Sequence, residues 1–416
     1  MSSRANRTGA ALALAGAVAL GAVVVRAERV SPSRPHTIVV GASSARAPMP
    51  RVDGRRTALT RQTLPTGGLV IEWRKALGVA IEQAPLVDAQ GQVIVLTSRG
   101  DVYAFDAEGD ERWRVTTGLQ AAQGPVLLAD GTVMFLAPSG EIVGVRDGTR
   151  RFQRRLSAER PPRLAPLPLE DGGAVVATPG EILFVDATGA IRARSTLDEP
   201  LTSGLLAAPG RILGVAASGT VYAMEPGRDA VRVGSFGGSV DLGAAMLSDS
   251  TLVAVVDQQR LVEVDWTRQT ATTRATAPAG LYLGAPAIRA GTAYVLGYLP
   301  GRTFVLGVGR DGQDVLRAAA STWAVTTLPD GGAPSLVAPP HAGPLVDPAG
   351  TVAFVTPDGS VGAASVAGGV STVGEVVCTR SLGRSQPSAG GLAPAGPNAF
   401  YVSCENGQLA RITGSR

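Results

Sequence analysis

Residues 100–114 read GDVYAFDAEGDERWR, and this stretch predicts two short strands joined by a tight turn. β-branched and aromatic residues fill its first half, which is typical of a strand. Asp106 and Gly109 then supply a side chain that caps a turn and a residue that tolerates positive φ. Upstream, residues 84–88 (APLVD) and 91–97 (GQVIVLT) predict two more strands. Residues 84–114 are therefore expected to form four short strands separated by turns.

The same pattern returns every ~40 residues from residue 68 onward. The second strand of each copy is apolar on both faces, as expected for a strand packed between two neighbouring sheets. A four-stranded unit of this size is not stable alone, and radial stacking buries both of its faces. The sequence thus predicts an all-β fold, an eight-bladed β-propeller of four-stranded antiparallel blades over residues 68–416. Later copies begin near Gly124, Ala165, Ser203, Gly243, Ala285, Gly343 and Ser388.

The last copy supplies only three strands before the chain stops. The missing outer strand is expected at the other end of the repeat region, where residues 70–74 (VIEWR) resemble residues 111–114 (ERWR). Val70 and Trp73 are the residues of this strand that we expect to close the ring. An N-terminal strand that completes the last blade would close the propeller without a covalent link.

The N-terminus resembles an export signal. Arg4 and Arg7 precede an apolar run from Ala10 to Val25, and small residues follow it. Residues 1–27 are therefore expected to be a signal peptide or an N-terminal membrane anchor, and no cysteine follows for lipid attachment. The Pro- and Arg-rich residues 28–67 have little apolar periodicity and are predicted to be a flexible tether. We expect an exported protein, either periplasmic or anchored to the membrane and facing the periplasm.

The basic charge of the chain does not indicate nucleic-acid binding. The net charge is +4 and the pI about 9.4, but many arginines lie in the first 61 residues and the remainder is nearly balanced. No stripe of aromatic and basic residues is present that would stack bases. We expect no nucleic-acid partner, contact with a membrane only through the N-terminal segment, and a monomer.

The cysteines and histidines leave little for catalysis. Cys378 and Cys404 are the only cysteines, and they form either one disulfide or two buried free thiols. His36 and His341 are the only histidines, so a zinc site or a Ser-His-Asp arrangement has almost no residues to use. No acidic loop with the spacing of a calcium site occurs. The sequence therefore predicts no catalytic residue, no metal site and no cofactor.

One departure from the repeat lies at about residues 318–341, between the sixth and seventh copies. Insertions in repeat folds fall in loops, and loops carry binding residues. Trp323, Asp330 and His341 are therefore candidates for a partner-binding loop, with Trp323 as the anchor. The alternative is an ordinary long connection.

The stretch at 102–113 resembles the PQQ-like (quinoprotein-type) propeller repeat. Ala104, Asp106, Gly109 and Trp113 match its pattern, although the family's Thr before the glycine is absent. The resemblance implies an eight-bladed fold and two classes of function. Some members are dehydrogenases that hold a quinone and calcium, those of the alcohol type with a disulfide between adjacent cysteines. Others are non-catalytic, such as the propeller lipoprotein of the outer-membrane β-barrel assembly machinery.

Two features favour the non-catalytic branch. Cys378 and Cys404 are not adjacent, and most acidic residues fall at turn positions that recur with the repeat. We therefore expect a non-enzymatic scaffold that binds a protein partner in the cell envelope. The alternatives are an atypical PQQ-dependent oxidoreductase and a glycan-binding module.

Overall fold

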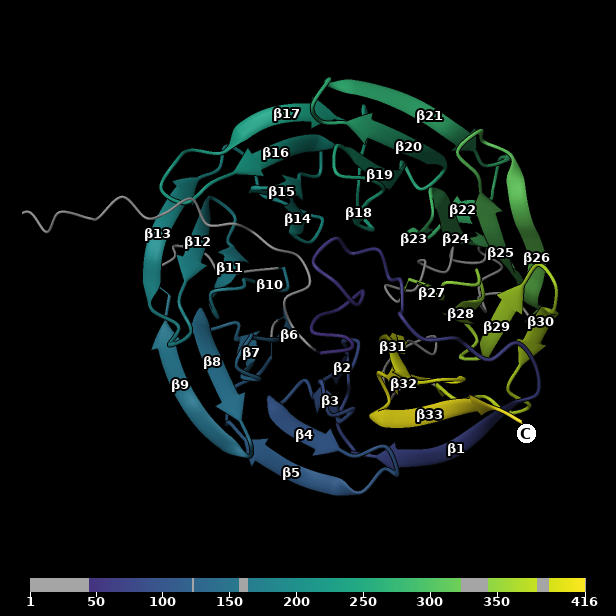
Figure 1. The fold of residues 1–416 in the computed structure, drawn as a ribbon, viewed down its shortest axis with the longest axis horizontal. Coiled ribbons are helices and arrows are strands. Elements are labelled where there is room, and N and C mark those ends of the chain that lie inside the picture. The colour runs from purple at the N-terminus through teal and green to yellow at the C-terminus, as the bar shows by residue number, and fades with distance from the viewer. Residues whose placement is uncertain (1–44, 122, 157–163, 323–342, 380–388, 416) are drawn as a thin grey trace, which may run out of the picture. The chain divides into compact units, whose positions relative to one another are not determined.

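Eight small antiparallel sheets follow one another around a central axis in the computed structural model (Figure 1). The structure describes residues 45–121, 123–156, 164–322, 343–379 and 389–415, and these contain no helix. Each sheet is one blade, and its strands run in order from the axis to the rim. This is the predicted eight-bladed β-propeller.

Short strands line the axis, and buried strands follow them. The innermost strands of blades 1 to 8 are β2 (Leu86–Val87), β6 (Gln123–Leu127), β10 (Leu167–Pro168), β14 (Leu206–Ala208), β18 (Ala244–Met246), β22 (Tyr282–Leu283) with β23 (Ala287–Arg289), β27 (Leu345–Val346) and β31 (Ala389–Gly396). The second strands are β3 (Val93–Leu96), β7 (Val133–Leu136), β11 (Ala174–Ala177), β15 (Arg211–Val215), β19 (Thr251–Val256), β24 (Thr292–Leu299), β28 (Val352–Val355) and β32 (Ala399–Cys404).

The third and outer strands complete each blade. The third strands are β4 (Asp101–Phe105), β8 (Glu141–Arg146), β12 (Glu181–Val185), β16 (Thr220–Met224), β20 (Arg260–Asp265), β25 (Arg302–Val308), β29 (Val361–Ser365) and β33 (Gln408–Gly414). The outer strands are β5 (Glu111–Thr116), β9 (Thr149–Arg155), β13 (Ile191–Thr196), β17 (Val231–Ser235), β21 (Thr270–Thr276), β26 (Asp314–Thr322), β30 (Gly369–Thr372) and β1 (Leu69–Ala76).

Blade 8 is built from both ends of the repeat region. Its strand order is β1-β33-β32-β31, and β1 pairs antiparallel with β33 from Leu69–Gly414 to Ala76–Gln408. An ion pair between Glu72 and Arg411 joins the same two strands. The predicted closure of the ring by an N-terminal strand is confirmed.

Hydrophobic packing between blades forms the core. All four residues of β3, β7, β11 and β28 are buried, because a second strand faces a neighbouring blade on each side. The outer strands are mostly exposed. The core is therefore a circle of inter-blade layers rather than one central cluster.

The turns explain the repeated aspartates. The Asp106 carboxylate accepts hydrogen bonds from the backbone of Glu108 and Asp110, at 3.1 and 2.8 Å. Asp186 and Asp265 cap their turns in the same way. These contacts confirm the turn-capping role expected of Asp106 and show that it recurs in later blades.

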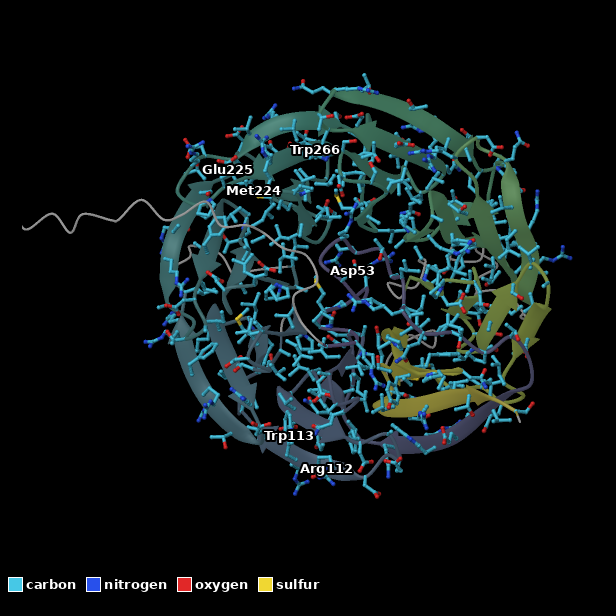
Figure 2. All side chains as sticks on the ribbon, viewed as in Figure 1. Asp53, Arg112, Trp113, Met224, Glu225 and Trp266 are labelled. Carbon is cyan, nitrogen blue, oxygen red and sulfur yellow. A yellow bond between two sulfur atoms is a disulfide. The ribbon has the colours of Figure 1, made fainter. Side chains whose placement is uncertain are left out.

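The repeated Trp and Gly positions meet across blade boundaries. A Cβ atom added to Gly109 would lie 3.0 Å from the Trp73 indole, and one at Gly148 would lie 3.3 Å from the Cβ of Trp113. Trp113 lies in the outer layer of blade 1 (Figure 2). Gly189 of blade 3 contacts Phe152 of blade 2 likewise. Each aromatic residue thus packs closely on the turn glycine of the next blade, where an added side chain would be crowded.

The prediction of a flexible tether over residues 28–67 is wrong for residues 45–67. Ala47, Met49, Ala58, Thr60 and Leu64 are buried against the blades. The composition suggested disorder because the segment has little apolar periodicity of its own, and its partners come from distant blades. For residues 28–44, which lie outside the described ranges, the tether stays a prediction.

Candidate functional site

The two faces of the ring differ in what they carry. Four antiparallel strands bring the chain back to the side on which each blade began, so every connection between blades lies on one face. We call it the connection face; it also carries the turns between second and third strands. The opposite side, the turn face, carries the other two turns of each blade.

Residues 45–64, the channel segment, run along the inside of the ring. The purple trace inside the inner strands in Figure 1 is this segment, and Asp53 lies at the centre in Figure 2. Its backbone is hydrogen-bonded to blades 1, 2, 4, 5, 6, 7 and 8. The blade residues are Val87, Leu127, Ala207, Met246, Ile288, Val346 and Asn398. Met49 joins a hydrophobic cluster that contains Leu167 of blade 3.

The middle of the channel segment is a closed loop. The Ala58 amide donates to the Arg51 carbonyl at 3.1 Å, and the Asp53 carboxylate accepts from the amide and hydroxyl of Thr57 at 3.0 and 2.6 Å. Val52 has a φ of 72°, which is strained for a β-branched residue. Such strain persists only where the surroundings impose it, and it is common at functional sites.

A cavity of about 510 Å³ lies at the connection-face end of the channel. The closed loop contributes Arg51 and Arg56 to it, and the rest of the lining comes from several blades. The blade residues include Glu82, Ala84, Leu164, Thr202, Gly204, Asp241, Gly343, Gly391 and Glu405. The channel is therefore filled from the turn face and hollow toward the connection face.

Burial dominates the electrostatics of this cavity. It lowers the pKa of Arg51 to about 9, helped by repulsion from Arg56, and that of Arg56 to about 10. Burial also raises the pKa of Asp53, against the hydrogen bonds from Thr57. Both guanidinium groups are thus held where their positive charge is poorly solvated.

A second cavity, of about 400 Å³, lies on the turn face between blades 1 and 2. Asp88, Asp130, Arg146 and Asp147 line it, and Arg146 forms ion pairs with Asp130 and Asp147 at 3.5 and 3.4 Å. Burial raises the pKa of Asp88, although backbone amides bind its carboxylate. These charges are paired within the two turns, so this cavity has a structural explanation.

Trp323, Asp330 and His341, the predicted partner-binding residues, lie outside the described residues. The strands that lead to their loop are described. β26, with nine residues, is longer than any other strand in the described chain, and blade 6 is the five-stranded sheet because β22 and β23 both pair with β24. β26 ends at Thr322, and the described chain resumes at Gly343, which lines the connection-face cavity.

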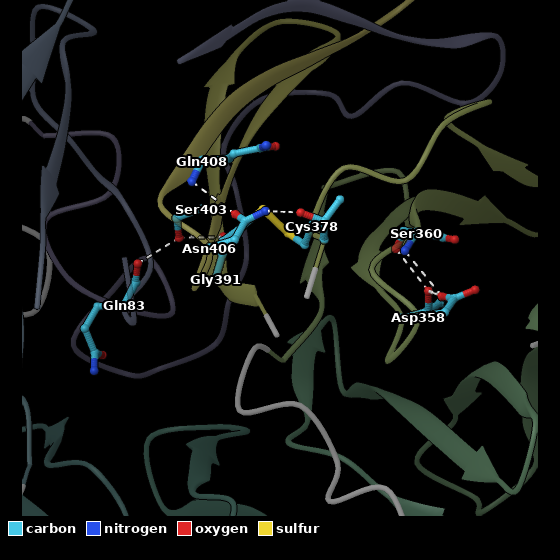
Figure 3. Close-up of a disulfide and its surroundings, with 11 residues drawn as sticks. Gln83, Asp358, Ser360, Cys378, Gly391, Ser403, Asn406 and Gln408 are labelled. Carbon is cyan, nitrogen blue, oxygen red and sulfur yellow. Dashed lines mark hydrogen bonds between the residues drawn. A yellow bond between two sulfur atoms is a disulfide. The ribbon is translucent and has the colours of Figure 1, made fainter. Parts of the chain in front are cut away.

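Cys378 and Cys404 are bonded to each other in the structure (Figure 3). Cys378 follows β30 of blade 7, Cys404 ends β32 of blade 8, and both are fully buried. Asn406 donates to the hydroxyl of Thr379 at 2.6 Å beside the disulfide. The bond therefore ties the connection between blades 7 and 8 to the blade that closes the ring.

Val70 and Trp73 lie in β1, where Val70 is largely exposed and Trp73 partly buried. The Trp73 ring packs against Tyr401 of β32, with ring centroids 5.7 Å apart.

The sequence pattern does not indicate that Arg51 and Arg56 line a cavity. Asp53-Gly54 followed by Thr57 is a signal for a turn, but nothing in the pattern indicates that the turn lies inside a ring.

Two kinds of feature are absent from the described residues. Within the described ranges, no group of three or more His, Cys, Asp or Glu side chains comes together as a possible metal site. No helix that is long and apolar enough to cross a membrane occurs in the described part of the chain.

Comparison with known proteins agrees with this architecture. Residues 52–177 match the family model described as outer membrane protein assembly factor BamB. The crystal structure of BamB from Moraxella catarrhalis superposes with a TM-score of 0.59 at 17% identity, covering 83% of this chain and 99% of that one. The computationally designed protein Ika8 superposes with a TM-score of 0.57 at 14% identity, covering 82% and 98%. No curated protein sequence matches. The chain is thus similar to BamB in the repeats of its first blades and in the fold of its ring.

Proposed function

We propose that this protein is a non-enzymatic scaffold that binds a protein partner in the cell envelope. The observation that carries the proposal is the match of residues 52–177 to the BamB family model, together with the shared eight-bladed fold. A propeller offers a rigid surface on which loops from several blades lie side by side.

The filled channel supports a scaffold over the rival class, a quinone-dependent oxidoreductase. The channel segment passes through the centre of the ring, and its backbone occupies hydrogen-bonding groups of nearly every inner strand. A cofactor on the axis would have to share this space with Arg51, Asp53 and Arg56. The rival predicts dye-linked oxidation of alcohols or sugars after addition of the quinone and calcium. The scaffold proposal predicts none.

The partner is proposed to bind on the connection face, near blade 6. The long strands of blade 6 carry the connection from Thr322 to Gly343, which is proposed to present Trp323 as an anchor, with Asp330 and His341 beside it. Residues 1–27 are proposed to export the chain and either to be cleaved or to remain as an anchor. The protein is proposed to act as a monomer on the periplasmic side.

Site-specific photocrosslinking in cells of the source organism tests this surface. A photoreactive residue in place of Arg302, an exposed residue at the connection-face turn of blade 6, should yield one discrete crosslinked protein. The same residue in place of Asp147, exposed on the turn face, should yield none.

A substitution tests whether the crosslink depends on Trp323 rather than on the rest of the connection face. Trp323→Ala should abolish the crosslink from position 302, whereas Val366→Ala, at an exposed turn-face position of blade 7, should leave it intact. Equal crosslinking from positions 302 and 147, or an unchanged crosslink in Trp323→Ala, would contradict the proposed surface.

A further inference from the structure

The two arginines of the channel segment lack the partners that buried cations need. The Arg51 guanidinium donates to the carbonyl of Pro286 and, through Nε at 3.3 Å, to that of Arg56. Its Nη1 atom is buried without an acceptor, as are Nε and Nη1 of Arg56. Within the described residues, the Arg56 guanidinium donates no hydrogen bond at all. A buried donor left unpaired is costly, and more so when it is charged.

The nearest carboxylate does not fill this gap. Asp53 lies in the same closed loop, but its oxygen atoms accept hydrogen bonds from Thr57 rather than from either guanidinium. Asp241 and Glu82 lie at the exposed rim of the cavity, and Asp241 accepts from the hydroxyl of Ser239. Among the described residues, Asp53 is the carboxylate whose negative charge acts on both guanidiniums.

The surrounding backbone is shaped around these side chains. A Cβ atom on Gly204 of blade 4 would collide with the Arg56 guanidinium, and one on Gly343 would collide with that of Arg51. Both glycines precede innermost strands on the connection face and line the same cavity. The strained loop positions the two arginines, and the two glycines leave room for their side chains. The two guanidiniums are thus held at the inner end of a cavity that opens to one face.

We propose that this cavity binds an oxyanion, a carboxylate or phosphate group of a small ligand, between Arg51 and Arg56. Guanidinium groups bind these oxyanions through short charge-assisted hydrogen bonds. The bound group supplies acceptors for the orphaned donors and a negative charge for two poorly solvated cations. Glu82, Asp241 and Glu405 around the cavity disfavour a large polyanion and favour a ligand with one anionic end.

The lowered pKa values agree with this assignment. Burial disfavours the charged form of Arg51 and Arg56, and a bound anion reverses that effect. Anion binding should therefore raise the thermal stability of the protein, because the ligand binds the folded chain and not the unfolded one.

Calorimetric titration of the purified full-length protein tests the site at constant ionic strength. Inorganic phosphate is one probe, and triglycine with a free or an amidated C-terminus is the other. Saturable one-site binding of phosphate, or of the free acid but not the amide, is expected. The phosphate titration and the triglycine titrations distinguish a phosphate ligand from a carboxylate ligand. Absence of saturable binding to every probe overturns the proposal.

Variants locate the site. Arg56→Met should weaken binding by about tenfold or more, as should Arg51→Met, because each removes one charged donor group. Arg228→Met, at an exposed position outside the cavity, should bind like the unchanged protein. Unaltered affinity in either cavity variant overturns the proposal. If a methionine variant does not fold, Arg56→Gln is measured in its place against the same two outcomes. Neither result depends on the proposed protein partner.

Discussion

The indole Nε1 of Trp73 donates a hydrogen bond of 2.8 Å to the carbonyl oxygen of Ala107, across the boundary between blades 8 and 1. Trp73 belongs to the strand that closes the ring, and Ala107 to the turn after β4. The same indole packs against Gly109 and Tyr401. One side chain thus joins the closing strand to blade 1 and to β32 of its own blade.

Trp73→Ala should therefore destabilise the ring. We expect the free energy of unfolding to fall by about 3 kcal/mol, as for other large aromatic truncations. Trp73→Phe should keep the ring contacts and lose only the hydrogen bond, at a cost of about 1 kcal/mol. Urea unfolding followed by circular dichroism measures both, with Val366→Ala as the exposed control. Equal stability of Trp73→Ala and the control would show that the closure does not depend on this residue.

The disulfide provides a second, covalent support for blade 8. Cys378 and Cys404 are 26 residues apart, and a loop of that length should contribute about 3 kcal/mol by restricting the unfolded chain. The double variant Cys378→Ala/Cys404→Ala should be less stable by that amount.

The bond can also be detected directly. Peptide mapping without reductant should recover the two cysteines in one crosslinked pair. Two free thiols in the denatured, unreduced protein would contradict the bond.

The stability of the protein should fall at alkaline pH. Burial raises the pKa of Tyr401 to about 12 and raises that of Tyr298 as well. A phenol with a higher pKa in the folded chain adds stability below its unfolded pKa of about 10, and this is lost as pH rises through the folded value. The free energy of unfolding should therefore decline between about pH 10 and 12.

Tyr401→Phe isolates one of these groups. The Tyr401 hydroxyl is buried without a hydrogen-bond partner, so its removal should cost nothing at pH 7. At pH 11 the variant should have lost about 1 kcal/mol less than the unchanged protein. Parallel stability curves for the two proteins from pH 8 to 11 would contradict the pKa shift.

Much of the ring could be predicted because its determinants are local and repeated. Asp106 and Gly109 define a turn within a few residues, and Trp113 recurs at a fixed distance from them. Even the closing strand was predictable, because residues 70–74 carry the same outer-strand pattern without its preceding strands. Repetition let weak signals from single blades support one another.

The channel segment was not predictable for a physical reason. Its backbone makes one or two hydrogen bonds with each of several blade residues, which are spread along the chain from Val87 to Asn398. Its sequence therefore has no apolar periodicity. Arg51 and Arg56 read as solvated charges in isolation, and they are partly buried only because a complete ring surrounds them.

Thermal unfolding of three shortened chains tests most directly whether residues 45–76 form an integral part of the propeller. A chain that begins at residue 45 should melt at the same temperature as the full-length protein. One that begins at residue 68 loses the channel segment but keeps β1, and it should melt at a clearly lower temperature. One that begins at residue 77 loses ring closure as well and should be the least stable. Equal melting temperatures for the chains that begin at residues 45 and 68 would contradict the account.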